Sequence, residues 1–362
     1  MHLSYCTNVH PAEDLDGIIG QLDTYAVRIR SRLSLDVLGL GLWLAAPVAA
    51  ALAEDTGLRG RLRRELDARG LEVVTLNGFP YAAFQAPIVK NAVYHPDWTT
   101  PDRLAYTLDL ARILADLLPD RASYGSISTL PLAWRTPWDA TYADTAARRF
   151  DDLAKGLAAI SGAAGRPIRV GLEPEPGCVV ETTGQAVEQV SRLDNEWIGV
   201  CVDLAHLACA WEDPAEAVAR LTSAGIPIVK VQVSAALEAA DPSVEVLREY
   251  AEPRFLHQTR NASGEAADDL DEAIERGLSG PWRIHYHVPL HAAPAAPLTS
   301  TVAVTRAAIR HLLPVCRHFD VETYTWNVLP ASQRPGDDEE LAAGIAAELA
   351  FAQNLLAEAG AR

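Results

Sequence analysis

The sequence has few basic residues for its size, and this deficit excludes one large class of partner. Its 362 residues include 31 Lys and Arg against 48 Asp and Glu, for a formal net charge of −17. A surface this acidic repels the phosphate backbone of nucleic acids. Because no basic run interleaved with aromatic residues offsets the charge, we expect no nucleic acid as a partner.

Cysteine is also scarce, and its spacing does not fit a disulfide framework. The chain has five cysteines, an odd number, and no Cys-x-x-Cys pair occurs. Free thiols are typical of a reducing compartment, so we expect a cytoplasmic protein. The first five residues lack the basic segment of a signal peptide. A Gly-x-Gly-x-x-Gly motif after a predicted strand is missing too, so the sequence gives no support for a nicotinamide site.

Only one stretch is long and uncharged enough to resemble a membrane span. Residues 37–53 carry no charge, but the stretch is short for a span and Pro47 interrupts it. We interpret it as a buried strand, residues 38–44, followed by a helix with Pro47 in its first turn. We therefore expect no direct membrane insertion.

Short apolar runs alternate with longer helical patterns along most of the chain. The short runs are rich in Val, Ile, Leu and Tyr and are continuously apolar, which is typical of parallel strands buried on both faces. Repeated strand–helix units indicate helical crossovers, and we predict an α/β fold of the (β/α)₈ TIM-barrel type. The predicted strands are residues 3–10, 38–44, 72–77, 124–129, 168–172, 198–203, 228–234, 282–288 and 319–326.

Eight strands close such a barrel, so one of these nine is surplus. The connection from residue 234 to the last strand is far longer than an ordinary strand–helix link. We interpret residues 235–297 as an insertion after strand seven, part helix and part hairpin, with strands at 254–260 and 282–288. Since it leaves the C-terminal end of that strand, we expect it to cover the barrel mouth as a lid. No Ser- or Gly-rich linker divides the chain, so we predict one domain, residues 1–362.

Acidic residues follow three predicted strands at the ends that form the active-site mouth of these barrels. Glu173, Asp203 and Glu322 would converge there, with few basic residues nearby in the sequence. Each alone could cap a helix or pair with an Arg, but together they would repel, and a divalent cation is the simplest remedy. Gln232 would complete the set as a neutral ligand. Oxygen-dominated ligation favours Mg²⁺ or Mn²⁺, with Zn²⁺ as an alternative.

Three polar residues close to these strand ends are candidates for substrate contact. His206 follows Asp203 by three positions and could orient a hydroxyl, shuttle a proton or simply bond a loop carbonyl. Lys230 could hold an anionic group or form a buried ion pair within the sheet. Glu175 lies just beyond the fifth strand.

Three histidines of the predicted insertion form a further candidate group. His285 and His287 are two residues apart and share one face if this run is a strand, with His257 in the proposed partner strand. Contact with substrate, metal ligation and a structural role all remain open. The spacing differs from that of common zinc sites.

Amides and aromatic rings at other strand ends complete the predicted binding site. The first strand ends with Asn8 and His10, and the third is followed by Asn77 and Tyr81. Amides can bond hydroxyl groups, and aromatic rings commonly face carbohydrates. Trp326 after the last strand is a wall candidate, with core packing as the alternative.

The order of these motifs resembles the xylose-isomerase-like barrels. Leu-Glu on strand five, Asp-x-x-His on six, a polar residue on seven and Glu on eight are similar to that family, which includes keto-sugar epimerases, hydroxypyruvate isomerase and endonuclease IV-type nucleases. The resemblance implies a metal on Glu173, Asp203, the seventh-strand residue and Glu322. The epimerases have a His on strand seven, whereas Gln232 here is similar to hydroxypyruvate-isomerase-like members.

Longer motifs are similar to EboE, the sugar-isomerase-like member of the metabolite traffic proteins. The resemblance implies a role in handling a polyol-derived metabolite beside a membrane prenyltransferase-like protein. Homo-oligomer formation is left open by the sequence. The matching runs are residues 5–10, 75–81, 126–129, 172–176 and 321–326.

Together these features predict a metal-dependent isomerase or epimerase for a small polyhydroxylated carbonyl metabolite. The metal would polarise a carbonyl and stabilise an enediolate, while Glu173 and Glu322 exchange a proton with the substrate and His206 positions a hydroxyl. Two alternatives stay open: a carrier that binds the same ligand without changing it, and a metal-dependent hydrolase.

Overall fold

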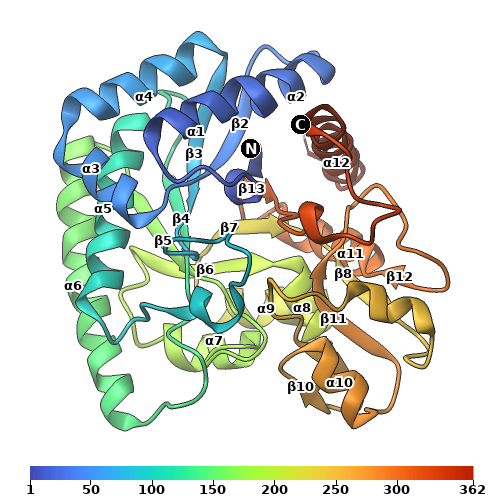
Figure 1. The fold of residues 1–362 in the computed structure, drawn as a ribbon. Coiled ribbons are helices and arrows are strands. Elements are labelled where there is room, and N and C mark those ends of the chain that lie inside the picture. Colours follow the sequence, from blue (N-terminus) through green and yellow to red (C-terminus); the bar gives the residue numbers. More distant parts are fainter. Residues whose placement is uncertain (362) are drawn as a thin grey trace.

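Eight parallel strands form a closed barrel in the computed structural model, which describes residues 1–361 (Figure 1). Around the barrel the order is β1-β13-β7-β6-β5-β4-β3-β2. This arrangement confirms the predicted TIM barrel. The strands are β1 (His2–Cys6), β2 (Leu38–Trp43), β3 (Leu71–Asn77), β4 (Gly125–Thr129), β5 (Ile168–Leu172), β6 (Ile198–Asp203), β7 (Ile228–Val233) and β13 (His318–Val321).

Helices cover the outside of the barrel, and several begin at the predicted caps. Asp213 accepts hydrogen bonds from the backbone N–H groups that open α9, and Pro214 is the first residue of that helix. Pro47 lies in the first turn of α3, as predicted. The helices are α1 (Leu15–Gln21), α2 (Val27–Arg32), α3 (Ala46–Glu54), α4 (Thr56–Ala68), α5 (Pro101–Leu117), α6 (Ala140–Ala164), α7 (Thr183–Val190), α8 (Leu204–Cys209), α9 (Pro214–Ser223), α11 (Val302–Leu312) and α12 (Asp338–Glu358).

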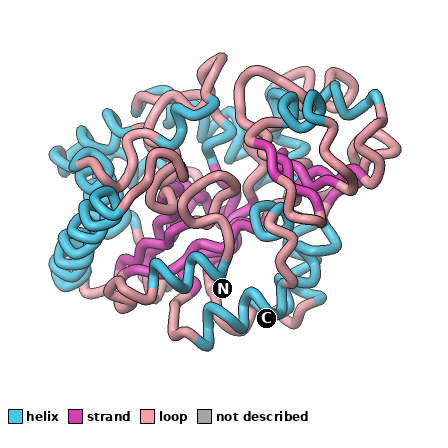
Figure 2. The backbone as a smooth tube through the Cα atoms, turned by 90° about the horizontal axis from the view of Figure 1, so that it is seen from below, coloured by secondary structure: helices cyan, strands magenta, loops and turns pink. Residues whose placement is uncertain are grey.

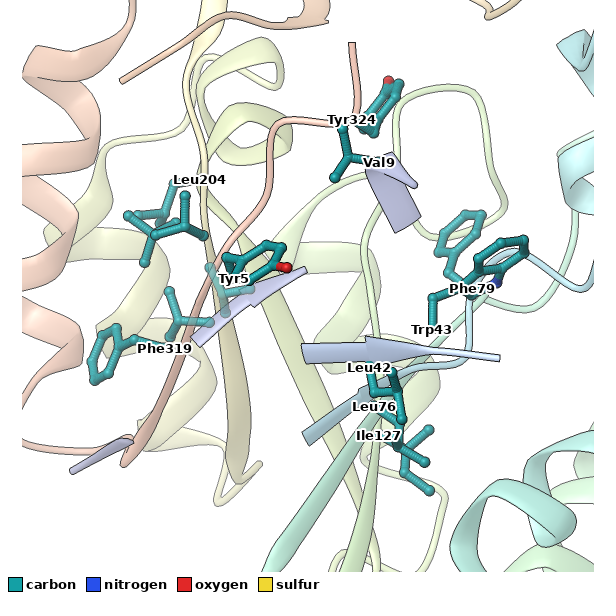
Figure 3. Packing of buried hydrophobic residues seen from close by; sticks show 14 of the residues in the cluster. Tyr5, Val9, Leu42, Trp43, Leu76, Phe79, Ile127, Leu204, Phe319 and Tyr324 are labelled. Atoms are coloured by element: carbon teal, nitrogen blue, oxygen red, sulfur yellow. The ribbon is translucent and has the colours of Figure 1, made fainter. Parts of the chain in front are cut away.

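Alternate strand residues pack toward the helices and toward the barrel interior. Leu42, Leu76 and Ile127 occupy matching positions on β2, β3 and β4, and they are fully buried in the apolar cluster shown in Figure 3. The intervening positions of β3 and β4 are Thr75 and Ser126, whose hydroxyls bond to each other at 2.8 Å. The strands are therefore apolar on one face and partly polar on the other.

A buried ion pair fills the barrel interior below the strand ends. Lys230 Nζ lies 2.8 Å from Asp320 Oδ2, both side chains are fully buried, and Ser4 Oγ donates to Asp320 Oδ1 at 2.6 Å. Gly41 makes room for this pair, because a Cβ there would lie 2.0 Å from an Asp320 oxygen. The charges at this level are therefore satisfied within the protein.

The segment after β7 forms a second sheet beside the barrel, which confirms the predicted position of the insertion. Figure 2 shows its strands as a group apart from those of the barrel. The sheet is antiparallel, with the order β10-β9-β11-β8-β12. Its elements are β8 (Ala236–Ala239), η4 (Glu245–Tyr250), β9 (Thr259–Asn261), β10 (Ala266–Ala267), α10 (Leu270–Arg276), β11 (Trp282–His287) and β12 (Thr299–Ser300).

This five-stranded sheet corrects the predicted hairpin. The expected strand at 254–260 is reduced to β9, and β8, β10 and β12 were not predicted. β8 consists of Ala, Leu and Glu, which favour helices, but pairing between β11 and β12 holds it extended. β10 and β12 have only two residues each, too few to show a period.

Two barrel strands end earlier than predicted. The first ends at Cys6, and Thr7–Val9 form a 3-10 helix (η1). The last ends at Val321, and Trp326–Val328 form another (η5). At the barrel mouth the backbone turns and brings polar side chains inward. Strand pairing stops there, although apolar residues continue in the sequence.

The insertion contacts the β3–α5 loop above the mouth of the barrel. This loop includes η3 (Lys90–Tyr94), and the backbone N–H groups of Val89 and Lys90 both donate to the carbonyl of Arg254, at 2.7 and 2.8 Å. The rings of Phe84 and Phe255 lie 5.2 Å apart, and Tyr324 lies 4.8 Å from Phe255. Segments that are far apart in the sequence thus cover the same face of the barrel.

Candidate active site

Three buried carboxylates converge at the C-terminal ends of the barrel strands. Glu173 follows β5, Asp203 is the last residue of β6, and Glu322 follows β13; all three are at most 5% exposed. Asp203 belongs to two groups of potential metal ligands, one shared with Glu173 and His206 and the other with His287 and Glu322. Within each group the ligand atoms lie within 4.8 Å of one another.

Hydrogen bonds orient two of the carboxylates and leave oxygens free. Asp203 Oδ1 accepts from the backbone N–H of His206 and from Ser234 Oγ, both at 2.9 Å. Glu322 Oε1 accepts from the amides of Asn8 and Asn77, at 2.7 and 2.8 Å. Asp203 Oδ2 and Glu173 Oε2 are buried with no hydrogen-bond partner among residues 1–361.

Burial and mutual repulsion disfavour negative charge in this cluster. Burial raises the pKa of Glu173 to about 8, with His206 lowering it and Asp203 raising it. The pKa of Glu322 is raised well above its usual value by burial, then by the charges of Glu173 and Asp203. Such carboxylates need a proton or a cation to remain buried.

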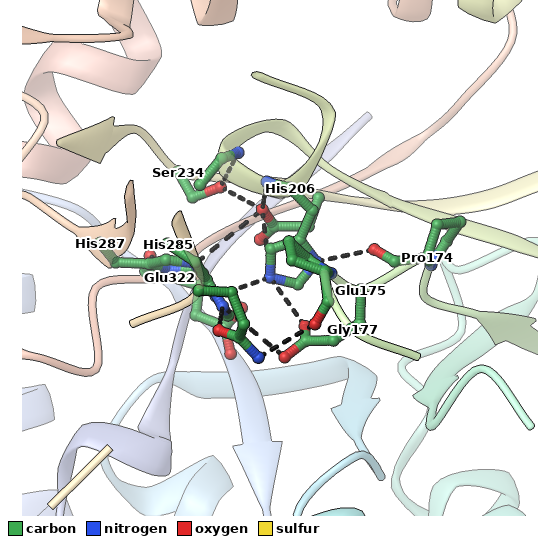
Figure 4. A network of polar contacts seen from close by, with 12 residues as sticks. Pro174, Glu175, Gly177, His206, Ser234, His285, His287 and Glu322 are labelled. Carbon is green, nitrogen blue, oxygen red and sulfur yellow. Dashed lines mark hydrogen bonds and ion pairs between the residues drawn. The ribbon is translucent and has the colours of Figure 1, made fainter. Parts of the chain in front are cut away.

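A histidine and a glutamate form the adjoining part of the site (Figure 4). His206 Nε2 lies 3.0 Å from Glu175 Oε2 and 2.9 Å from His285 Nε2, while its Nδ1 donates to the carbonyl of Pro174 at 2.8 Å. Burial alone would lower the pKa of His206, but the nearby carboxylates, Asp203 foremost, raise it to about 9. Burial lowers the pKa of His285 well below its usual value. His206 is therefore the charged donor of this pair and His285 the neutral acceptor.

His287 approaches the carboxylates from β11 of the inserted sheet. Its Nδ1 donates to the backbone carbonyl of Glu322 at 2.8 Å, and its Nε2 lies 3.9 Å from Asp203 Oδ1. Burial lowers the pKa of this imidazole to about 4, although Asp203 raises it. The ring is therefore neutral at physiological pH.

Buried carboxylates and imidazoles of this kind can hold a divalent metal ion. Mg²⁺ and Mn²⁺ prefer oxygen ligands, and imidazole nitrogens suit Mn²⁺ less than Zn²⁺. Gln232, which pairs in register with Asp203, is fully buried, and neither amide atom has a hydrogen-bond partner within the described chain. The residues present thus fit a metal. Few basic residues are near the carboxylates in the sequence, but folding brings His206 and His287 to 3.7 and 3.9 Å from Asp203.

A small cavity opens above this cluster. Its polar side includes Asn8, Asn77, Glu175 and His285, all of which were predicted to contact substrate. The facing walls are mainly apolar and come from the β3–α5 loop, the insertion and the segment after β13. These wall residues are Phe79, Pro80, Phe84, Val89, Val93, Tyr94, Phe255, Leu256 and Tyr324.

Five predicted substrate contacts lie outside this cavity. Lys230 is in the ion pair with Asp320, the alternative noted from the sequence. His257 donates from Nδ1 to the carbonyl of His285 at 3.0 Å and from Nε2 to Glu252 Oε1 at 2.8 Å. His10 stacks on Tyr25 with ring centroids 4.0 Å apart.

The remaining two are aromatic side chains that pack in the body of the protein. Tyr81 lies against Tyr106 with ring centroids 5.1 Å apart. Trp326 Nε1 donates to Glu348 Oε2 at 3.0 Å, and its ring packs over Gly344, where a Cβ would lie 2.6 Å away. A strand-end position therefore indicates proximity to the mouth, whereas side-chain direction depends on the local turn.

Several cavity residues were not identified from the sequence. Tyr94 donates to Glu175 Oε1 at 2.9 Å and accepts from Gln258 Nε2 at 2.6 Å, and Gln258 Oε1 in turn bonds His285 Nδ1 at 2.8 Å. These contacts join the β3–α5 loop to the insertion. Neither segment has a period or motif that could have predicted them.

The chain belongs to the xylose isomerase-like TIM barrel family, whose model matches residues 42–246. A search of curated proteins finds no match to this sequence. Among the described residues, no helix is long and apolar enough to cross a membrane.

Solved structures of low sequence identity share the fold over almost their whole length. D-psicose 3-epimerase from Clostridium cellulolyticum H10, solved with D-tagatose, is 15% identical with a TM-score of 0.53, covering 98% of this chain and 99% of that one. A xylose isomerase-like protein from Mycobacterium smegmatis in complex with magnesium is 14% identical with a TM-score of 0.56, covering 98% and 97%. The IolI protein with a bound zinc atom is 14% identical with a TM-score of 0.50, covering 99% of each chain.

Proposed function

We propose that this protein is a metal-dependent isomerase or epimerase acting on a small polyhydroxylated carbonyl compound. The observation that carries the proposal is the convergence of Glu173, Asp203 and Glu322, buried beneath a cavity with free carboxylate oxygens. Gln232, with its unpartnered amide beside Asp203, is the proposed neutral ligand. The similar structures with magnesium and zinc support one divalent ion, with Mg²⁺ or Mn²⁺ preferred for an oxygen-rich set.

A bound ion would polarise the substrate carbonyl and stabilise the negative charge of an enediolate. Glu173 and Glu322 flank the reacting carbon in this proposal, one removing a proton and the other returning it. The two amides on Glu322 Oε1 fix the direction of its other oxygen. His206, oriented by the bond from its Nδ1 to the Pro174 carbonyl, would turn its Nε2–H from Glu175 and His285 to a substrate hydroxyl. The aromatic walls would exclude water from the enediolate.

Proton exchange with solvent tests this chemistry directly. A set of ketoses and related polyol-derived ketones, incubated with the metal-loaded protein in deuterated water, should gain deuterium beside the carbonyl in at least one compound. Glu173→Gln and Glu322→Gln should abolish the exchange. If a compound binds in the cavity but never exchanges, the protein is instead the carrier considered from the sequence, and if a bond is hydrolysed without exchange it is a hydrolase.

The finer assignments from the sequence belong to the same proposal. They are membership of the EboE type, one domain over residues 1–362 with the insertion as a lid, a cytoplasmic location, a functional link to a membrane prenyltransferase-like protein, and homo-oligomer formation. Co-purification of the tagged protein with membranes tests the link, and its mass in solution tests the oligomeric state.

A further inference from the structure

The imidazole of His287 reaches Asp203 and Glu322 from β11, outside the barrel. Its side chain is fully buried, and its Nε2 has no hydrogen-bond partner in the part of the chain that the structure describes. That atom forms a group with oxygens of Asp203 and Glu322, all within 4.8 Å of one another. An unpaired polar atom in this position costs free energy unless something binds it.

The other ring nitrogen determines which proton the imidazole carries. His287 Nδ1 lies 2.8 Å from the backbone carbonyl of Glu322, and a carbonyl can only accept, so Nδ1 carries the hydrogen. In a neutral ring this leaves a lone pair on Nε2, on the side of Asp203. Metal-bound histidines characteristically have this arrangement, in which the distal nitrogen donates to a carbonyl or carboxylate.

The backbone around His287 is held from several directions. The N–H of Val288 donates to the carbonyl of Ala235 at 2.9 Å, and Thr325 Oγ1 donates to the carbonyl of His287. The pairing of β11 with β8 shifts register between Ile284 and His287, a bulge that re-aims the side chains which follow. Together with the bond from Nδ1 to the Glu322 carbonyl, these contacts hold the ring toward the carboxylates.

We propose that His287 is a metal ligand, supplied by the inserted sheet, that joins Asp203 and Glu322 on the ion. This inference rests on the proposed function, because it needs a metal at the carboxylates. It adds a nitrogen donor to the oxygen ligands proposed from the barrel. A nitrogen donor favours Mn²⁺, Co²⁺ or Zn²⁺ over Mg²⁺. It also means that metal binding joins the insertion to the barrel.

Two substitutions separate the ligand atom from the structural hydrogen bond. His287→Asn retains an N–H near the Nδ1 position, where it can still donate to Glu322, but has no atom at Nε2. His287→Gln instead places an amide group near Nε2. His291→Asn in the same insertion is the control, because His291 lies outside the cavity, where its ring packs beside Trp326.

The probe is Mn²⁺, whose affinity is measured by competition with a chelator and whose ligands are measured by pulsed EPR. We expect an imidazole ¹⁴N coupling in the full-length protein, its loss in His287→Asn, and an affinity at least about 100-fold weaker in that variant. His291→Asn should match the unmodified protein. Circular dichroism checks folding, and if His287→Asn does not fold, loss of the coupling in His287→Gln supports the same conclusion.

The possible results distinguish the role of His287 as a ligand from the existence of the metal site itself. If Mn²⁺ binds, depends on Asp203, and keeps its nitrogen coupling and affinity in His287→Asn, His287 is not a ligand while the metal centre stands. If Mn²⁺ binds with no imidazole coupling in the unmodified protein, the inference is likewise wrong. If neither Mn²⁺, Zn²⁺ nor Mg²⁺ binds at the carboxylates, both proposals fail together.

Discussion

The barrel mouth and the inserted sheet contribute to one cavity, but their side chains are positioned by different means. Glu173, Asp203 and Glu322 stand at strand ends, so closing the barrel is enough to bring them together. His285 and His287 lie on β11 of the insertion, not at the end of a barrel strand. They reach the mouth only because the inserted sheet packs on that face of the barrel. The barrel thus supplies the carboxylates and His206, and the insertion adds His285 and His287.

Buried charged residues lie at two heights in the barrel, and they differ in how far other residues pair with them. Below the mouth, Lys230 and Asp320 neutralise each other at 2.8 Å. At the mouth, oxygens of Asp203 and Glu173 are buried without hydrogen-bond partners in residues 1–361. His206 pairs with Glu175 and Asp203 at this level, and the oxygens that stay unpartnered are those that support the proposed metal.

Removing two barrel carboxylates should have the largest effect on this comparison. In Asp203→Asn with Glu322→Gln the proposed site loses two negative ligands, and metal affinity should fall by more than about 100-fold. Isothermal titration with Mn²⁺ measures the change. Asp241→Asn, on the protein surface, is the control. Unchanged affinity in the double variant would place the metal elsewhere.

Breaking the lower pair should reduce stability rather than metal binding. Lys230→Met leaves Asp320 buried and unpaired, which should lower the free energy of unfolding by about 3–5 kcal/mol. Adding Asp320→Asn removes the stranded charge while retaining an acceptor for Ser4, so much of the loss should be recovered. Urea denaturation measures both variants. A greater loss of stability in the double variant would show that charge pairing does not stabilise this part of the barrel.

Metal affinity should increase with pH up to about pH 8. The pKa of Glu173 is raised to about 8 and that of Glu322 well above its usual value, so a metal must displace protons below that pH. We expect a roughly tenfold gain per pH unit for each proton displaced. Chelator competition between pH 6 and 9 measures it, and a flat profile would contradict the raised values.

The raised pKa of Glu173 also affects the stability of the metal-free protein, which should decrease as the pH rises. Because the folded-state pKa of Glu173 lies above the unfolded value of 4.5, its contribution to stability is complete below pH 4.5 and is lost as pH rises through 8. His206, raised to about 9 from 6.5, acts in the same sense at higher pH. Melting temperatures with chelator should therefore fall from pH 6 to 9, and less steeply in Glu173→Gln.

The smallest effect should come from a predicted binding residue that lies outside the cavity. Trp326→Phe removes the bond to Glu348 and should lower the free energy of unfolding by about 1–2 kcal/mol. Ligand affinity and KM should not change, since the ring does not line the cavity. A changed KM at equal stability would return Trp326 to the binding site.

Much of the barrel could be predicted because its signals are local. Continuous apolar runs marked all eight strands to within a few residues, and caps such as Asp213 marked helix starts. The insertion could be located from its length alone. Its internal structure could not, because β8 has the composition of a helix and becomes a strand only by pairing with its neighbours.

The sequence by itself determined which carboxylates meet at the barrel mouth. A residue at the C-terminal end of a parallel barrel strand lies at the mouth whatever the conformation of the loops. Glu173, Asp203 and Glu322 follow from that rule. Only the tertiary structure decided which other groups join them. His287 enters the cluster while His257 and Lys230 turn away, because long-range pairing and packing, which leave no period in the sequence, set their side-chain directions.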